Sequence, residues 1–134
     1  MMRLLLPLLL CGFLRGGEYV VVVAAGESVG KQVSSATLSA LFLKKRAFLE
    51  EMAVVPVNLS ASDPVRLAFE KAVLEVPREE LNDYWIEQHY RGVSPPVVQR
   101  SQNGVKAFLR NVPGAVGYIE KANLEPGLTV LHEF

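Results

Sequence analysis

The sequence predicts an α/β fold, in which strands alternate with helices and the helices cover both faces of one sheet. Residues 19–24 form a valine-rich run typical of a strand buried on both sides. Downstream, short apolar runs alternate with segments of helical periodicity. Half of the 134 residues are apolar, which is enough for one hydrophobic core without disulfides or metals.

The first helix and the second strand follow a polar, glycine-containing stretch over residues 25–33. Ser35 or Thr37 is placed to cap a helix that runs to about Lys44. Its apolar residues have i, i+3, i+4 spacing at positions 38, 41 and 42. The apolar run over residues 54–57 is the second predicted strand.

The next helix has a strong start signal, with Asp63 at the cap and Pro64 at the first helical position. Apolar residues then recur at helical spacing to about residue 73. A further helix opens at Pro77 with acidic residues in its first turn, and Gly92 lies beyond its end. Its predicted inner face includes Trp85 as a large core residue.

The last third of the chain continues the alternation. Residues 97–99 are predicted to form a short strand, and Ser101 caps a helix that stops before Pro113. Residues 116–119 form the next strand, and residues 128–131 form a last strand at an edge of the sheet.

The N-terminus has the pattern of an export signal. Arg3 is followed by an almost wholly apolar stretch over residues 4–14, which is short for a membrane span. We therefore expect residues 1–17 to be a signal peptide, residues 18–134 to be a single domain, and the protein to reside in the periplasm. An uncleaved inner-membrane anchor is the alternative. Cys11 is the only cysteine, so the expected mature chain has no thiol for a disulfide, a nucleophile or a metal.

Composition and motifs exclude several classes of function. The 14 basic and 14 acidic residues balance without a basic run, so no nucleic-acid partner is expected. His89 and His132 do not have the spacing of a zinc site, and no nucleotide-binding or nucleophile motif occurs. We therefore expect no enzyme activity, no catalytic residue, no cofactor and no metal.

The transition from the second strand to the helix at Pro64 is the candidate ligand site. A helix N-terminus that follows a strand presents unpaired amides and a positive dipole to anions. Ser60 and Ser62 could donate hydroxyl groups there, and Arg66 could clamp an anion from the first turn. Asp63 is more simply explained as an N-cap, and Arg66 as an exposed residue or a partner of Asp63. These four residues are the predicted ligand-binding set.

Two segments resemble a known family. Residues 37–45 read T-L-S-A-L-F-L-K-K, which resembles a helix of the periplasmic substrate-binding proteins of phosphate ABC transporters. Residues 113–118 read P-G-A-V-G-Y and resemble that family's P-G-A-[IV]-G-Y segment. The resemblance implies one lobe of a periplasmic-binding-protein-like fold. That lobe is expected to be a three-layer sandwich with a mixed sheet of about five strands.

The chain departs from the family where phosphate is expected to bind. Positions 63–65 read D-P-V where the family has S-G-T, so an amide and a hydroxyl are lost and a negative charge is gained. The resemblance implies a protein related to phosphate uptake, with phosphate or another small oxyanion as the ligand. The alternative is an envelope interaction module, or sensor accessory, that docks to a membrane transporter or sensor component and has no small ligand. The oligomeric state stays open.

Overall fold

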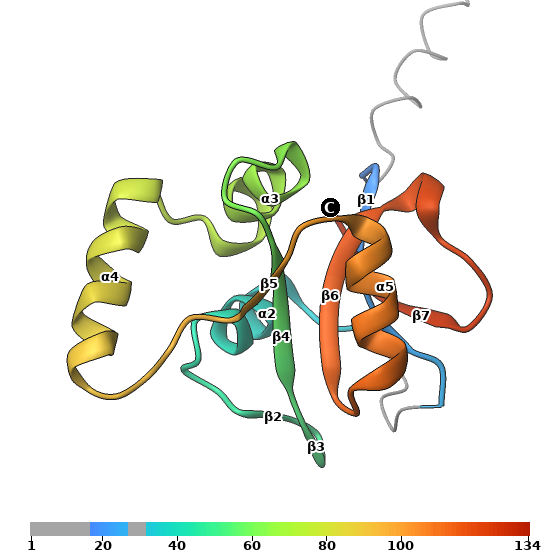
Figure 1. Ribbon diagram of the computed structural model, residues 1–134, viewed down its shortest axis with the longest axis horizontal. Helices are drawn as coiled ribbons and strands as arrows, with labels where there is room; N and C mark the ends of the chain where they lie inside the picture. The colour runs from blue at the N-terminus through green and yellow to red at the C-terminus, as the bar shows by residue number, and fades with distance from the viewer. Residues whose placement is uncertain (1–16, 27–31) are drawn as a thin grey trace, which may run out of the picture.

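The computed structural model describes residues 17–26 and 32–134, and these form one mixed sheet flanked by helices (Figure 1). The sheet has five strands in the order β5-β4-β6-β1-β7. Their bounds are β1 Tyr19–Ala24, β4 Val55–Leu59, β5 Val97–Gln99, β6 Ala115–Glu120 and β7 Leu128–Glu133. β4 runs parallel to β5 and β6, whereas β1 is antiparallel to β6 and β7. The predicted α/β class with a mixed five-stranded sheet is confirmed.

Neighbouring residues of β6 define the two faces of the sheet. A Cβ atom at Gly117 would lie 2.7 Å from the Val105 side chain of α5 (Gln102–Asn111). The next residue, Tyr118, stacks at 4.1 Å between ring centroids on Phe69, at the end of α3 (Pro64–Phe69). Because successive strand residues point to opposite faces, α5 and α3 cover opposite sides, which makes the three-layer arrangement.

The valine run predicted as a buried strand is β1, with Val20 to Val23 at most 1% exposed. Valine is stiff at χ1 and packs well on a pleated surface, so four in succession suit a strand covered on both faces. β7 is an edge strand, as predicted.

The helices start close to their predicted positions. α2 spans Ser35–Phe42, but its cap is Ser34, whose side chain accepts from the Thr37 amide. α4 spans Arg78–Tyr90 after Pro77, and Ser101 caps α5 through the Gly104 amide. α2 stops short of the predicted end at Lys44, which has a φ of 62° in the left-handed region.

Three features of the fold were not predicted. A small hairpin joins β2 (Phe48–Leu49) to β3 (Met52–Ala53). α3 continues into a π-helix, η1 (Glu70–Leu74), which ends at Glu75 with a φ of 56°. A 3-10 turn, η2, spans Lys121–Asn123. The π turn leaves the apolar spacing of a helix intact, which explains why the pattern to residue 73 did not reveal it.

The start of β1 and the end of β7 lie side by side. The Tyr19 and Phe134 backbones exchange hydrogen bonds of 3.1 and 2.9 Å, and their rings stack at 5.3 Å. Figure 1 shows this point at the same end of the sheet as α3. The predicted signal peptide spans residues 1–17. All of it except Gly17 lies outside the described residues. Within residues 17–26 and 32–134, no helix has the length and apolarity needed to cross a bilayer.

Candidate functional site

The four predicted ligand residues lie together where β4 passes into α3. β4 ends at Leu59, and the Ser60 carbonyl accepts a 2.9 Å hydrogen bond from the Asp63 amide, which closes a turn. Ser60 is half-buried and Ser62 is exposed. The structure therefore places the start of α3 at a strand end and at the surface, as the sequence predicts.

Asp63 closes the start of α3 with its own carboxylate. Its Oδ1 atom accepts from the Val65 amide at 2.9 Å, and its main-chain carbonyl accepts from the Leu67 amide at 3.0 Å. Pro64 has no amide hydrogen to give. The N-cap role of Asp63 is confirmed, and this role leaves a negative charge where an oxyanion would approach.

Arg66 is turned into the protein. Its side chain is 16% exposed, its Nε atom donates to Glu70 at 3.0 Å, and its Nη1 atom donates to the Leu59 carbonyl at 2.9 Å. The predicted pairing of Arg66 with Asp63 is wrong, because the carboxylate one turn further along the helix takes the guanidinium instead. The i, i+4 spacing of Arg66 and Glu70 is visible in the sequence and favours this pair.

Glu70 binds a second arginine that the sequence analysis did not single out. Arg78, at the start of α4, donates from Nε to Glu70 at 2.9 Å and from Nη2 to the Ala61 carbonyl at 2.9 Å. Glu70 is only 5% exposed, and its charge is balanced by two guanidiniums, one on the part-buried Arg66 and one on Arg78, whose side chain is 38% exposed. We call Arg66, Glu70 and Arg78 the arginine–glutamate cluster. It ties α3 and α4 to the loop that follows β4.

A buried tyrosine forms hydrogen bonds with the last residues of β4. The Tyr118 hydroxyl donates to Asn58 Oδ1 at 2.8 Å and accepts from the Leu59 amide at 3.2 Å. Burial raises the pKa of this phenol well above its ordinary value, so Tyr118 is neutral throughout the physiological range. Tyr118 belongs to the P-G-A-V-G-Y segment, so part of that segment's role here is to position the strand before the candidate site.

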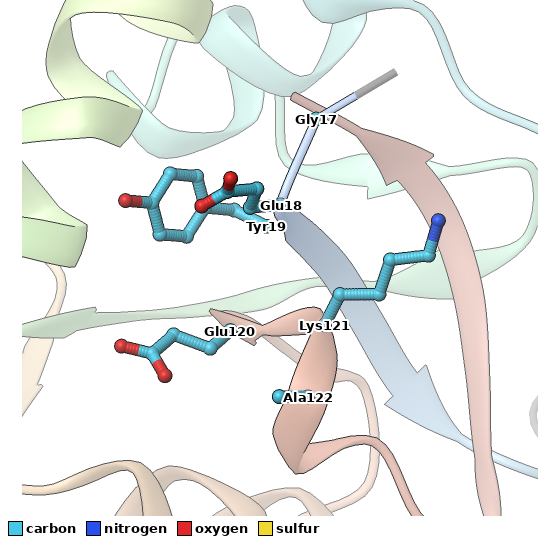
Figure 2. Close-up of a pocket in the computed structure, with 6 residues that line it drawn as sticks. All are labelled: Gly17, Glu18, Tyr19, Glu120, Lys121 and Ala122. Carbon is cyan, nitrogen blue, oxygen red and sulfur yellow. The ribbon is translucent and has the colours of Figure 1, made fainter. Parts of the chain in front are cut away.

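A second hollow lies at the same end of the sheet but is acidic. Its volume is about 470 Å³, and it lies between Gly17–Tyr19 and Glu120–Ala122 (Figure 2). Figure 2 shows the carboxylates of Glu18 and Glu120 on the side of the Tyr19 ring, whereas Lys121 points away from them. Lys121 is also paired with Glu133 at 3.1 Å. This hollow therefore does not have the charge that binds an oxyanion.

Exposed apolar side chains occur on α4 and, separately, on the edge strand β5. Ile86 and Tyr90 are 59% and 84% exposed, and Val97 and Val98 of β5 are 42% and 51% exposed. Trp85 is half-buried and packs against the hydrophobic core, so the prediction that it lies on the inner face of α4 holds, although the side chain is not fully enclosed. Figure 1 shows α4 standing away from the sheet, which explains why Leu81 is its one buried residue. Within the described residues, no cluster of three or more His, Cys, Asp or Glu side chains could hold a metal ion.

Comparison with solved structures finds a similar fold in three proteins. A Clostridium perfringens protein, described as a phosphate ABC transporter substrate-binding protein and determined with bound phosphate, superimposes with a TM-score of 0.69. The two are 13% identical over 85% of this chain and 44% of that one. An ABC-type phosphate transport receptor from Vibrio cholerae gives a TM-score of 0.69 at 18% identity over 85% and 45% of the chains. PstS from Borrelia burgdorferi superimposes with a TM-score of 0.64. It is 13% identical over 86% of this chain and 46% of that one.

The chain has the fold of the phosphate-transporter substrate-binding proteins. The resemblance stated from the sequence motifs is thereby confirmed as a likeness of fold, and the chain spans less than half the length of each of these proteins. No family model and no curated protein matches the sequence. Sequence identity below 20% supports a shared fold but not a shared ligand or partner. Ligand and partner must therefore be inferred from the residues of the site.

Proposed function

We propose that this chain is an exported, non-catalytic binding-protein lobe that acts by docking to another envelope protein, without phosphate at the start of α3. One observation carries the proposal: the charged groups at the candidate site are already paired within the chain. Asp63 takes the Val65 amide, and Glu70 takes both Arg66 and Arg78. An oxyanion at the helix start would meet a carboxylate about 4 Å away, which costs on the order of 1–4 kcal/mol.

The exposed apolar side chains of α4 and β5 support docking as the mode of action. Ile86, Tyr90, Val97 and Val98 leave large side chains in contact with water, and such groups at a strand edge and a protruding helix favour contact with a protein partner. A transporter or sensor component of the membrane is the partner class that the fold suggests.

Phosphate binding is the second candidate function. It is favoured by the phosphate held in the Clostridium perfringens structure of the same fold and by the exposed Ser62 at the helix start. In this alternative, Ser60, Ser62, Asp63 and Arg66 contact a phosphate or another small oxyanion. With an open site and one hydrated side, the affinity is expected to be weak.

Calorimetry separates the two functions. The protein is titrated with phosphate, sulfate and arsenate at fixed ionic strength. Docking predicts no heat up to millimolar ligand, and binding at low micromolar ligand would overturn it. The variant D63S tests why the native protein does not bind anions. If the Asp63 charge blocks the site, this change raises the affinity for anions, although Pro64 limits the gain.

Site-specific photocrosslinking in the periplasm tests docking directly. A photoreactive residue replaces the exposed Ile86 of α4, and a matched one replaces the exposed Ala107 of α5, the helix that covers the face of the sheet opposite α3. Docking predicts a discrete crosslinked product from position 86 and none from position 107. Identical patterns from both positions contradict it.

A further inference from the structure

The arginine–glutamate cluster has the composition of an oxyanion site with the anion supplied from inside the chain. The Oε1 atom of Glu70 accepts from Arg78 and its Oε2 atom accepts from Arg66, at 2.9 and 3.0 Å. Guanidinium groups form strong, charge-assisted hydrogen bonds with the oxygens of carboxylates and of phosphates alike. The cluster therefore binds its own carboxylate as it would bind an external anion.

The guanidiniums are held in place independently of Glu70. Arg66 also donates to the Leu59 carbonyl, and Arg78 also donates to the Ala61 carbonyl, each at 2.9 Å. Leu59 is the last residue of β4, and Ala61 lies in the loop that follows it. The Leu59 amide is held by a hydrogen bond to the Tyr118 hydroxyl. Removal of the Glu70 carboxylate would therefore leave two positioned positive charges.

Two of the three members of the cluster border a hollow that opens to solvent. A volume of about 460 Å³ lies along α3, η1 and the start of α4, and Glu70 and Arg78 are among its lining residues. Lys71 and Glu75 contribute one further charge of each sign to the lining. A water fills about 30 Å³ of liquid, so this hollow is large enough to admit a hydrated phosphate.

We propose that Glu70 is a built-in ligand of a two-arginine oxyanion site, which accepts an external oxyanion only when this carboxylate is displaced or neutralised. The ligand class is a tetrahedral oxyanion such as inorganic phosphate. Ser60, Ser62 and Asp63 are not among the residues that line the hollow beside this site. The inference rests on the proposed function, in which the resting chain is silent toward phosphate.

The test compares two variants that remove one negative charge from the same hollow. E70A frees both guanidiniums, whereas E75A removes a lining carboxylate that pairs with neither arginine. Calorimetry with inorganic phosphate, against chloride at equal ionic strength, is expected to give E70A roughly tenfold or greater tighter binding than the native chain. E75A should match the native chain, and E70A/R78Q should lose the gain.

Equal phosphate affinity in E70A and E75A would overturn the inference, since a general change in charge would then explain any gain. If E70A folds poorly, E70Q and E75Q serve instead, because glutamine keeps the shape and removes the charge. Phosphate should then raise the melting temperature of E70Q more than that of E75Q, and an equal rise contradicts the proposal.

The outcome for the proposed function is read separately. Low-micromolar binding by the native chain overturns the docking function, whatever the variants do. A silent native chain with equal variants leaves the docking function standing and removes the internal-ligand proposal. Arginine Nε–H resonances locate the anion: a shift at Arg66 and Arg78 in E70A supports the site, whereas a shift confined to the Val65 amide contradicts it.

Discussion

The Tyr118 hydroxyl donates a 2.8 Å hydrogen bond to the Oδ1 atom of Asn58, between two parallel strands of the sheet. The same oxygen accepts from the Leu59 amide at 3.2 Å. Since Tyr118 is fully buried and Asn58 is 9% exposed, water is poorly placed to replace these bonds. The pair fixes the last residues of β4, from which the loop to α3 begins.

Loss of the Tyr118 hydroxyl is expected to lower the free energy of unfolding by about 1–2 kcal/mol, because Y118F leaves a buried amide and a buried side-chain carbonyl without this partner. Urea denaturation measures the change. Y84F is the control, since the half-buried Tyr84 hydroxyl donates to the Leu43 carbonyl where water can substitute. A cost no greater than that of Y84F would contradict the structural role given to Tyr118.

Asp63 is expected to act on stability through its side-chain oxygen rather than its charge. D63A removes the bond to the Val65 amide and should cost about 1 kcal/mol of unfolding free energy, whereas D63N keeps a capping oxygen and should cost only a few tenths. Thermal and urea unfolding measure both. S62A, at an exposed neighbour in the same turn, should be nearly neutral. Equal losses in D63A and D63N would assign the effect to charge.

The sequence predicted those elements whose signals are local. The valines of β1 and the caps Asp63 and Ser101 were predicted from the sequence because strand burial and helix starts depend on a few adjacent residues. The β2–β3 hairpin was missed because its strands have only two residues each, too few to show alternation. The π-helix was missed because the buried residues Phe69 and Val73 are four positions apart, a spacing that an α-helix also has.

The candidate site was located correctly, but its charge pairing was not predicted. Ser60, Ser62, Asp63 and Arg66 do lie at one strand end, since the strand and the helix cap define that place. The direction of Arg66 depends on Glu70, which is close in sequence, and on the Leu59 carbonyl, whose position depends on the loop. Arg78 reaches the cluster only because α4 starts beside that loop, which is a tertiary relationship.

Glu125 is expected to contribute to the loss of folding stability at acidic pH. Hydrogen bonds from Lys106 and Arg110 lower the pKa of Glu125 from its ordinary value of 4.5. A carboxyl whose folded pKa is depressed stabilises the protein above its unfolded pKa, and this contribution is lost as pH falls from 4.5 through the lower folded value. E125Q should therefore flatten the pH dependence of the melting temperature below pH 4.5. E79Q, an exposed change of equal charge, should leave that slope as it is.

Gly117 is expected to be required for full folding stability because α5 packs directly on β6. An added Cβ would lie 2.7 Å from Val105 Cγ1, whereas its contacts with Leu109 and Val57 would be ordinary at 3.7 Å. G117A should therefore lower the unfolding free energy by about 1–3 kcal/mol, since Val105 is fully buried and has little room to move.

The double variant V105A/G117A identifies the cause of that loss. V105A removes the methyl group that the new Cβ would meet, so the two changes should be less destabilising together than the sum of the single variants, by roughly 0.5–2 kcal/mol. Urea unfolding of the four proteins gives the coupling energy. Strict additivity would mean that G117A acts through the backbone of β6 and not through its contact with α5, and the close approach of helix and strand would then not explain the glycine.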